Sequence, residues 1–413
     1  MEKITLKNNL DLYLEKSDKF KTWSASVYIY RPLNKTEASY NALLAKVLKT
    51  SSKDYPTRKL LAKKMDRLYG TYLSAGVRKY ADTHAIVFNI KSVCDCYLPE
   101  KITSSVCELL KKIITEPFLP NGVFEPSVVE LEKTNLIKQI EAYINDKSFY
   151  ADKRCLEILC EGDNYSTGVS GDIEIIKKIT PDSLYKHYLD VINNSKIDVF
   201  VCGNADVDAV CPSFETLKTN NTPLSASPFV PASECKEITE VMDVTQGKLV
   251  MGFTTDISDN ESRCKIMMFN AVFGGCPTSK LFNNVREKLS LAYYANSRIA
   301  VTKGIMFARS GIEIDKFSQV KDEILLQLES MANGNITNEE VENARSHLVN
   351  IYSSLDDDPE STVSLKSGWL TEGENRTVEE IIKGINKVTV DEIVDVAKSY
   401  RLSAIYFLKG EQE

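Results

Sequence analysis

Histidine is scarce in this chain, and the spacing of its histidines excludes one kind of metal site. The 413 residues include only His84, His187 and His347, each far from the next in the sequence. A compact zinc motif places two histidines on one helical turn, and no two of these residues can share a turn. We expect each of the three to be an ordinary helix or strand residue rather than a metal ligand.

An excess of positive charge and long apolar runs are also lacking. Lys and Arg total 51 against 58 Asp and Glu, so the net charge is −7, the wrong sign for binding a nucleic-acid backbone. No apolar run approaches the ~18 residues that cross a bilayer, and the first residues are charged where a signal peptide would be apolar. These features predict a cytoplasmic protein with neither nucleic acid nor a membrane as its partner.

The ten cysteines form no CxxC pair, because Cys94 and Cys96 are spaced as CxC and the others are scattered. In a large chain without a leader, this distribution is typical of reduced core thiols rather than of a disulfide framework. Hydrophobic residues make up 43% and charged residues 26%, as in folded globular proteins. The length predicts two or three domains, each large enough to bury a core.

The chain contains an internal duplication. Residues 211–235 hold four of the 13 prolines among Ser, Thr and Asn, which is typical of an interdomain linker. The segment before them, IEIIKKITPDSLYKHYLDVINNSKIDVFVCGN, matches the C-terminal segment VEEIIKGINKVTVDEIVDVAKSYRLSAIYFLKG. Each predicts a helix opened by a threonine N-cap, Thr180 or Thr389, and then a short strand. We therefore predict a first domain over 1–210, a linker over 211–235 and a second, homologous domain over 236–413.

Each copy alternates predicted strands and amphipathic helices. Residues 23–29 alternate apolar with polar or aromatic side chains, the pattern of a strand with one buried face. Helices are predicted over Thr57–Tyr69, Leu98–Thr115, Pro126–Asn145, Asp315–Ala332 and Thr337–Leu355. The predicted fold class is α+β, with two homologous domains, each a mainly antiparallel sheet with helices packed on one face.

Residues 273–297, FGGCPTSKLFNNVREKLSLAYYANS, resemble a signature of the insulinase, pitrilysin and mitochondrial-processing-peptidase superfamily. In the second domain of that superfamily, GG-x-x-S-x-LF-x-x-(V/I)RE-x-x-x-LAY is typical. The order of the repeats, the length of each half of the chain and the position of the linker agree with this superfamily. The resemblance therefore covers essentially the whole chain and implies the insulinase-like metallopeptidase fold. Active members carry an HxxEH motif in the first domain, whose two histidines bind zinc together with a distant Glu and whose own Glu is the general base.

By the flanking helix and strand, the HxxEH window falls on residues 41–45. Asn41 and Ala45 stand where the histidines would be, and Leu44 stands where the general base would be. The resemblance therefore implies a degenerate zinc motif with no catalytic residue.

The distant Glu falls in the segment LIKQIEAY, at Lys138 and Gln139. A lysine ammonium repels a divalent cation, so no metal or other cofactor is expected on this chain. A rewired site built from Glu130, Glu132 or Glu141 is the alternative, although no histidine is near them in the sequence.

The superfamily also uses an Arg and a Tyr seven residues apart to bind substrate beside the scissile bond, and those positions match Arg286 and Tyr293. A tetrahedral intermediate at zinc develops an oxyanion, to which a tyrosine hydroxyl can donate while an arginine holds a peptide carbonyl. Two other interpretations stay open. Arg286 pairs with Glu287 or a nearby acid while Tyr293 packs at the start of the next strand, or Tyr294 takes the role of the tyrosine.

Bacterial members of this superfamily resemble halves of a clam-shell, in which a zinc-bearing subunit pairs with a homologous subunit that supplies the Arg/Tyr pair. The resemblance implies that this chain is the noncatalytic subunit of such a heterodimeric zinc endopeptidase. Its partner would be an HxxEH-bearing subunit with the zinc, and its substrates would be unfolded peptides. The alternative is an inactive peptidase-like structural or adaptor protein, and homodimerisation of the isolated chain also stays open.

Overall fold

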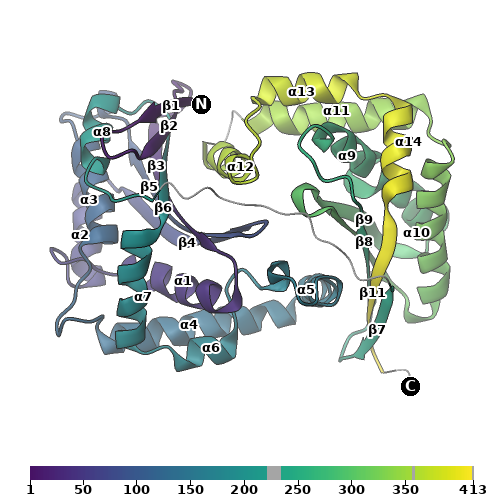
Figure 1. Ribbon diagram of the computed structural model, residues 1–413, viewed down its shortest axis with the longest axis horizontal. Helices are drawn as coiled ribbons and strands as arrows, with labels where there is room; N and C mark the ends of the chain where they lie inside the picture. Colours follow the sequence, from purple (N-terminus) through teal and green to yellow (C-terminus); the bar gives the residue numbers. More distant parts are fainter. Residues whose placement is uncertain (221–233, 356–358, 412–413) are drawn as a thin grey trace. The chain divides into compact units, whose positions relative to one another are not determined.

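Two mainly antiparallel sheets form the framework of the protein, as the sequence predicts. The computed structural model describes residues 1–220, 234–355 and 359–411, so residues 221–233 of the predicted linker lie outside the described residues. The described residues divide into two compact units (Figure 1). Unit 1 takes those within Met1–Ile140, Thr167–Ser225 and Leu355–Thr371, and unit 2 takes those within Glu141–Ser166, Ala226–Ser354 and Glu372–Glu413.

The sheet of unit 1 has six strands in the order β1-β2-β6-β3-β5-β4. Its strands are β1 (Glu2–Thr5), β2 (Asp11–Glu15), β3 (Thr22–Pro32), β4 (Tyr72–Tyr80), β5 (Thr83–Val93) and β6 (Lys196–Cys202). Only β2 and β6 are parallel neighbours, and every other pair is antiparallel. Strand β4 therefore lies at one edge of this sheet.

The sheet of unit 2 repeats the same arrangement with five strands, in the order β7-β11-β8-β10-β9. Its strands are β7 (Lys236–Val241), β8 (Gly247–Thr254), β9 (Ala292–Ala300), β10 (Ile305–Ile312) and β11 (Arg401–Lys409). The last strand of each repeat, β6 or β11, lies between one parallel and one antiparallel neighbour. This shared strand order corresponds to the internal duplication in the sequence.

Helices pack on the sheets of both units. Unit 1 contains α1 (Lys35–Leu48), α2 (Arg58–Arg67), α3 (Thr103–Thr115), most of α4 (Pro126–Asn145), α6 (Ile173–Lys178), α7 (Pro181–Asn194), α8 (Val207–Phe214) and α12 (Pro359–Thr371). Unit 2 contains α5 (Lys147–Leu159), α9 (Arg263–Asn270), the π-helices η3 (Ala271–Gly275) and η4 (Leu281–Lys288), α10 (Phe317–Ala332), α11 (Asn338–Ser354), α13 (Val378–Lys387) and α14 (Val390–Ser399). Short 3₁₀ turns are η1 (Asp95–Tyr97), η2 (Asn164–Ser166), η5 (Val301–Lys303) and η6 (Ile314–Lys316).

The two predicted threonine N-caps are confirmed. The hydroxyl of Thr180 accepts from the backbone N–H of Ser183 at the start of α7, and Thr389 does the same with Glu392 at the start of α14. In both cases the third helical residue returns a hydrogen bond to the cap, which satisfies N–H groups that have no partner inside the helix.

Both faces of β3 are buried, whereas the alternation of residues 23–29 predicts one buried face. On one face Val27 and Ile29 join the main apolar core of unit 1. On the other face Tyr28 packs with Phe200 of β6 and with Val363 of α12. Helix α12 belongs to the second sequence repeat, so the alternation of side chains in β3 does not indicate that a helix packs on the second face of this strand.

The sheet of unit 2 is likewise covered by a helix from the other sequence repeat. Helix α5 comes from the first sequence repeat and packs on β8 and β11, where Cys155 and Leu159 lie in one cluster with Val250 and Tyr406. Each sheet therefore carries, beside the helices of its own repeat, one helix supplied by the other repeat.

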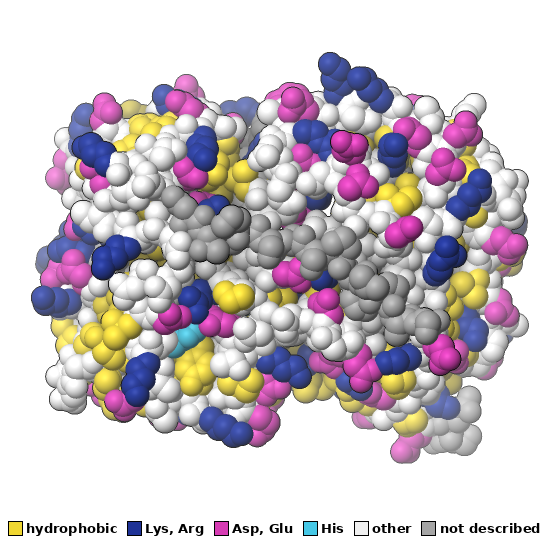
Figure 2. Space-filling view, viewed as in Figure 1, with side chains coloured by type: hydrophobic (Ala, Val, Ile, Leu, Met, Phe, Trp, Pro, Cys, Tyr) yellow, Lys and Arg dark blue, Asp and Glu magenta, His cyan; other side chains and the backbone are white. Residues whose placement is uncertain are grey.

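Charged side chains of both signs are interspersed over the face seen in Figure 2. Among residues 1–220, 234–355 and 359–411, no helix is long and apolar enough to cross a membrane.

Candidate functional site

The three functional positions of the HxxEH window lie in the middle of α1. This helix begins where the side chain of Asn34 accepts a hydrogen bond from the Glu37 backbone N–H. Asn41, Leu44 and Ala45 are each 0% exposed, and Leu44 and Ala45 belong to the apolar core of unit 1. Zinc ligands and a general base must reach the substrate, whereas these positions are sealed inside unit 1.

Asn41 is the centre of a chain of hydrogen bonds between three elements. Nε2 of His84 on β5 lies 2.8 Å from the Val169 carbonyl oxygen, and Nδ1 of His84 lies 3.0 Å from Nδ2 of Asn41. Nε2 of His187 on α7 lies 2.8 Å from Oδ1 of Asn41. A carbonyl oxygen only accepts, so His84 donates from Nε2 and accepts at Nδ1 from the Asn41 amide, and His187 donates to Asn41.

This chain of hydrogen bonds requires His84 to be neutral, because its Nδ1 accepts from the Asn41 amide, whereas Nε2 of His187 donates in either protonation state. Burial lowers the pKa of His187 to about 4, and burial also lowers the pKa of His84. The sequence predicts no hydrogen-bond partner for either histidine, because His84 and His187 are far apart along the chain and neither lies near Asn41 in sequence. The structure makes them hydrogen-bond partners of Asn41, the residue predicted to stand at a zinc-ligand position.

We expect the stability of unit 1 to fall as the pH drops from about 6.5 towards 4. The unfolded chain protonates His187 near its ordinary pKa of 6.5, whereas the folded chain does so only near 4, so the unfolded state binds more protons in this window. The slope is up to about 1.4 kcal/mol per pH unit for one histidine. Both tryptophans, Trp23 and Trp369, belong to unit 1, so fluorescence-monitored urea unfolding at several pH values reports this slope.

A variant comparison isolates the histidine from other groups. Burial raises the pKa of Asp198 in the same unit to about 6, which opposes the trend by stabilising the folded state as the pH falls. We therefore compare the wild-type slope with that of His187→Asn, which should be smaller by about one proton. His347→Asn in unit 2 is the matched control, and equal slopes for all three proteins would contradict the prediction.

The second part of the degenerate zinc site, on α4, is exposed. Lys138 and Gln139 lie on the solvent side of this helix. Two of the three carboxylates of the alternative site are engaged elsewhere: Glu132 pairs with Arg58, and Glu130 pairs with Lys133 at 2.9 Å.

The residues present do not fit a zinc ion. The Asn41 amide is used by two histidines, Leu44 and Ala45 offer no ligand atom, and Lys138 brings a positive charge. Within the part of the chain that the structure describes, no three His, Cys, Asp or Glu side chains are grouped to hold a metal.

In unit 2, Arg286 lies on η4 with its guanidinium partly exposed. Its Nε is 3.6 Å from Oε1 of Glu287, and the guanidinium carbon lies 4.8 Å from the centre of the Phe282 ring. The pairing with Glu287 that the sequence left open is therefore present. An exposed ion pair of this kind contributes little to stability, so Arg286 remains available for a ligand.

Tyr293 occupies a β-bulge on β9, the edge strand of the sheet. Tyr294 pairs with Gly311 of β10, and Ala292 pairs with Ile312, so Tyr293 has no residue opposite it. Its side chain is 54% exposed, which differs from the alternative in which it packs at the strand start. A bulge at a sheet edge redirects a side chain out of the regular alternation.

Tyr294 has a different environment. Its hydroxyl donates to Oγ of Ser148 at 3.3 Å, and burial raises the pKa of this hydroxyl. Its ring lies on Gly311, where an added Cβ would be 2.5 Å from the ring. Because Tyr294 is held in place on the sheet, the geometry favours Tyr293 for contact with a ligand. The roles of Arg286 and Tyr293 stay a prediction.

The fold and these positions define a two-repeat α+β protein built like a metallopeptidase, with apolar, amide or lysine side chains where the metal ligands are predicted. A family model described as the peptidase M16 inactive domain matches residues 178–348. The chain is 31% identical to "Probable inactive metalloprotease YmfF" of Bacillus subtilis (strain 168) over 410 residues, which cover 98% of this chain and 96% of that protein.

Solved structures share the fold of this chain. A conserved protein from Enterococcus faecalis V583 superposes with a TM-score of 0.92 at 30% identity, over 100% of this chain and 99% of that one. A peptidase M16 inactive domain from Pseudomonas fluorescens has a TM-score of 0.80 at 13% identity, over 100% and 98% of the two chains, which supports the fold alone. The chain therefore belongs to the peptidase M16 family. It is a noncatalytic member, as the degenerate motif predicts.

Proposed function

We propose that the chain is the noncatalytic subunit of a heterodimeric zinc endopeptidase. In this proposal a homologous HxxEH-bearing partner supplies zinc and the general base, and this chain supplies contacts to the peptide and to the transition state. The observation that carries the proposal is the contrast between two sets of residues. The zinc-ligand positions on α1 are sealed in the core, whereas Arg286 and Tyr293 are exposed on unit 2.

The edge of the unit 2 sheet supports the same proposal. Strand β9 is the last strand in the order β7-β11-β8-β10-β9 and carries Tyr293 on its bulge. An extended peptide can add to such an edge through main-chain hydrogen bonds. A peptide held along β9 would have its carbonyl groups within reach of a tyrosine hydroxyl and a guanidinium, both of which donate to carbonyl or oxyanion oxygen.

The proposal is tested by measuring hydrolysis of unstructured peptides by three samples. These are this chain alone, the HxxEH-bearing homologue from the same genome alone, and their mixture, with zinc quantified in each. We expect hydrolysis only in the mixture and stoichiometric zinc only in the homologue. If the two chains neither associate nor gain activity together, the structural or adaptor function replaces the peptidase-subunit proposal.

A further inference from the structure

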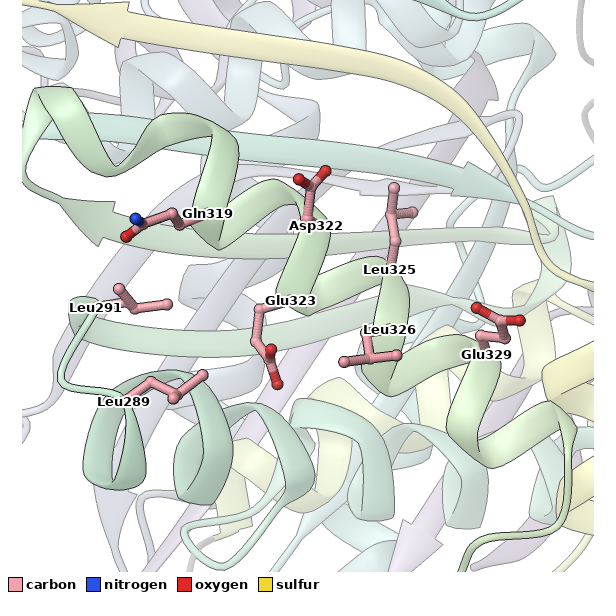
Figure 3. Close-up of a pocket in the computed structure, with 8 residues that line it drawn as sticks. All are labelled: Leu289, Leu291, Gln319, Asp322, Glu323, Leu325, Leu326 and Glu329. Carbon is pink, nitrogen blue, oxygen red and sulfur yellow. The ribbon is translucent and has the colours of Figure 1, made fainter.

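A groove with leucine walls lies between the end of η4 and α10 in unit 2 (Figure 3). Leu289 and Leu291 of the segment after η4 and Leu325 and Leu326 of α10 line the groove, and the hollow measures about 580 Å³. Leu289 is 44% and Leu326 53% exposed. Leucines gathered in a hollow of this size are typical of a site that binds an apolar group.

Carboxylates of α10 surround these leucines. Asp322, Glu323 and Glu329 all line the groove, and Asp322 and Glu329 are two helical turns apart on α10. The Nε2 of Gln327 donates to Glu323 at 2.7 Å. None of the three carboxylates has an ion-pair partner among the described residues, and the adjacent Lys321 pairs with Glu237 of β7 instead. The groove thus combines apolar walls with negative charge that the fold leaves uncompensated.

We propose that this groove binds a cationic segment of the peptide substrate, with a bulky apolar side chain between the leucines and lysine or arginine side chains beside the carboxylates. The proposal rests on the proposed function, because Leu289 and Leu291 lie in the same segment as Arg286 and Tyr293. Leu289 follows Arg286 by three residues and Leu291 precedes Tyr293 by two, so a peptide that contacts Arg286 and Tyr293 would pass near the groove walls. The negative charge selects basic peptides by complementarity, and the hollow accommodates side chains rather than a folded domain.

Binding of three fluorescent, unstructured peptides to the full chain tests the proposal. The first has two leucines flanked by lysines, and the other two carry glutamine or glutamate in place of lysine. We expect the lysine peptide to bind about tenfold or more tightly than the glutamine peptide, and added salt to remove this preference. The double variant Asp322→Lys, Glu329→Lys should abolish the preference, and Leu326→Ser should weaken binding of the lysine and glutamine peptides alike.

Asp395→Lys is the matched control, because Asp395 is an exposed carboxylate on α14 that does not line the groove. The milder double variant Asp322→Asn, Glu329→Gln guards against misfolding, and thermal unfolding of every variant checks its fold. Equal binding of the lysine and glutamine peptides, or a preference that survives the charge reversal, would overturn the groove proposal. In that case the proposed function still stands if the mixed subunits hydrolyse neutral peptides. If the chain prefers the lysine peptide but the mixed subunits show no gain in hydrolysis, the proposed function is rejected and the groove proposal is retained.

Discussion

Changing Arg286 to alanine or Tyr293 to phenylalanine is expected to lower peptide hydrolysis by the mixed subunits by about 100-fold. In the proposed function, Tyr293 donates a hydrogen bond to the developing oxyanion, and Arg286 holds a peptide carbonyl. Removing one preorganised donor to an oxyanion typically costs 10²–10³ in kcat, because no other group takes over the charge in a site without water. The rate is measured at saturating partner, with zinc content and association checked for each variant.

Two matched variants separate a contact with substrate from a structural role. Lys288→Ala removes an exposed cation on the same helix as Arg286, and it should leave the rate within a few fold of wild type. Tyr294→Phe removes the hydroxyl that donates to Ser148, so it should alter stability more than rate. Because Arg286 and Tyr293 are exposed, their variants should unfold like the wild type. If Arg286→Ala and Tyr293→Phe both leave hydrolysis undiminished, this result would count against the proposed function.

Rebuilding the general base by Leu44→Glu is expected to destabilise unit 1 by several kcal/mol, about 3 to 5, rather than to create a peptidase. Leu44 is 0% exposed in the apolar core. A carboxylate there has no solvent and no cation, so it must either stay charged at high cost or take up a proton. Such a loss is a large part of the 5–15 kcal/mol that usually stabilises a domain. Urea unfolding followed by tryptophan fluorescence measures it, since both tryptophans belong to unit 1.

Two milder substitutions serve as controls. Leu44→Met keeps the volume and polarity of the side chain and should cost less than about 1.5 kcal/mol. Gln139→Glu changes an exposed position of α4 and should stay within about 0.5 kcal/mol of wild type. If a chain carrying Asn41→His, Leu44→Glu, Ala45→His and Gln139→Glu folds and binds stoichiometric zinc, the fold still accommodates a zinc site, and the prediction is wrong.

Local patterns in the sequence were sufficient for much of the secondary structure. The helix predicted over Pro126–Asn145 has those bounds, because its apolar spacing and its proline at the start are local signals. The predicted helix over Leu98–Thr115 begins later, at Thr103, since Asp95–Tyr97 forms a short 3₁₀ turn and the side chain of Asp95 accepts from the N–H groups of Ile102 and Thr103. That hydrogen bond spans seven residues and is invisible to helical periodicity.

The sequence by itself determined the duplication, the α+β class and the family, and it predicts the loss of two zinc ligands at Asn41 and Ala45 and of the general base at Leu44. Each of these depends on residue identity or on short-range spacing. Only the tertiary structure decided that α5 and α12 each pack on the sheet formed mainly by the other repeat, and that Asn41 joins two distant histidines. It also decided which of two adjacent tyrosines is exposed, because the bulge at Tyr293 depends on how β9 pairs with β10. These features arise from contacts between residues far apart along the chain, for which a single sequence carries no periodic signal.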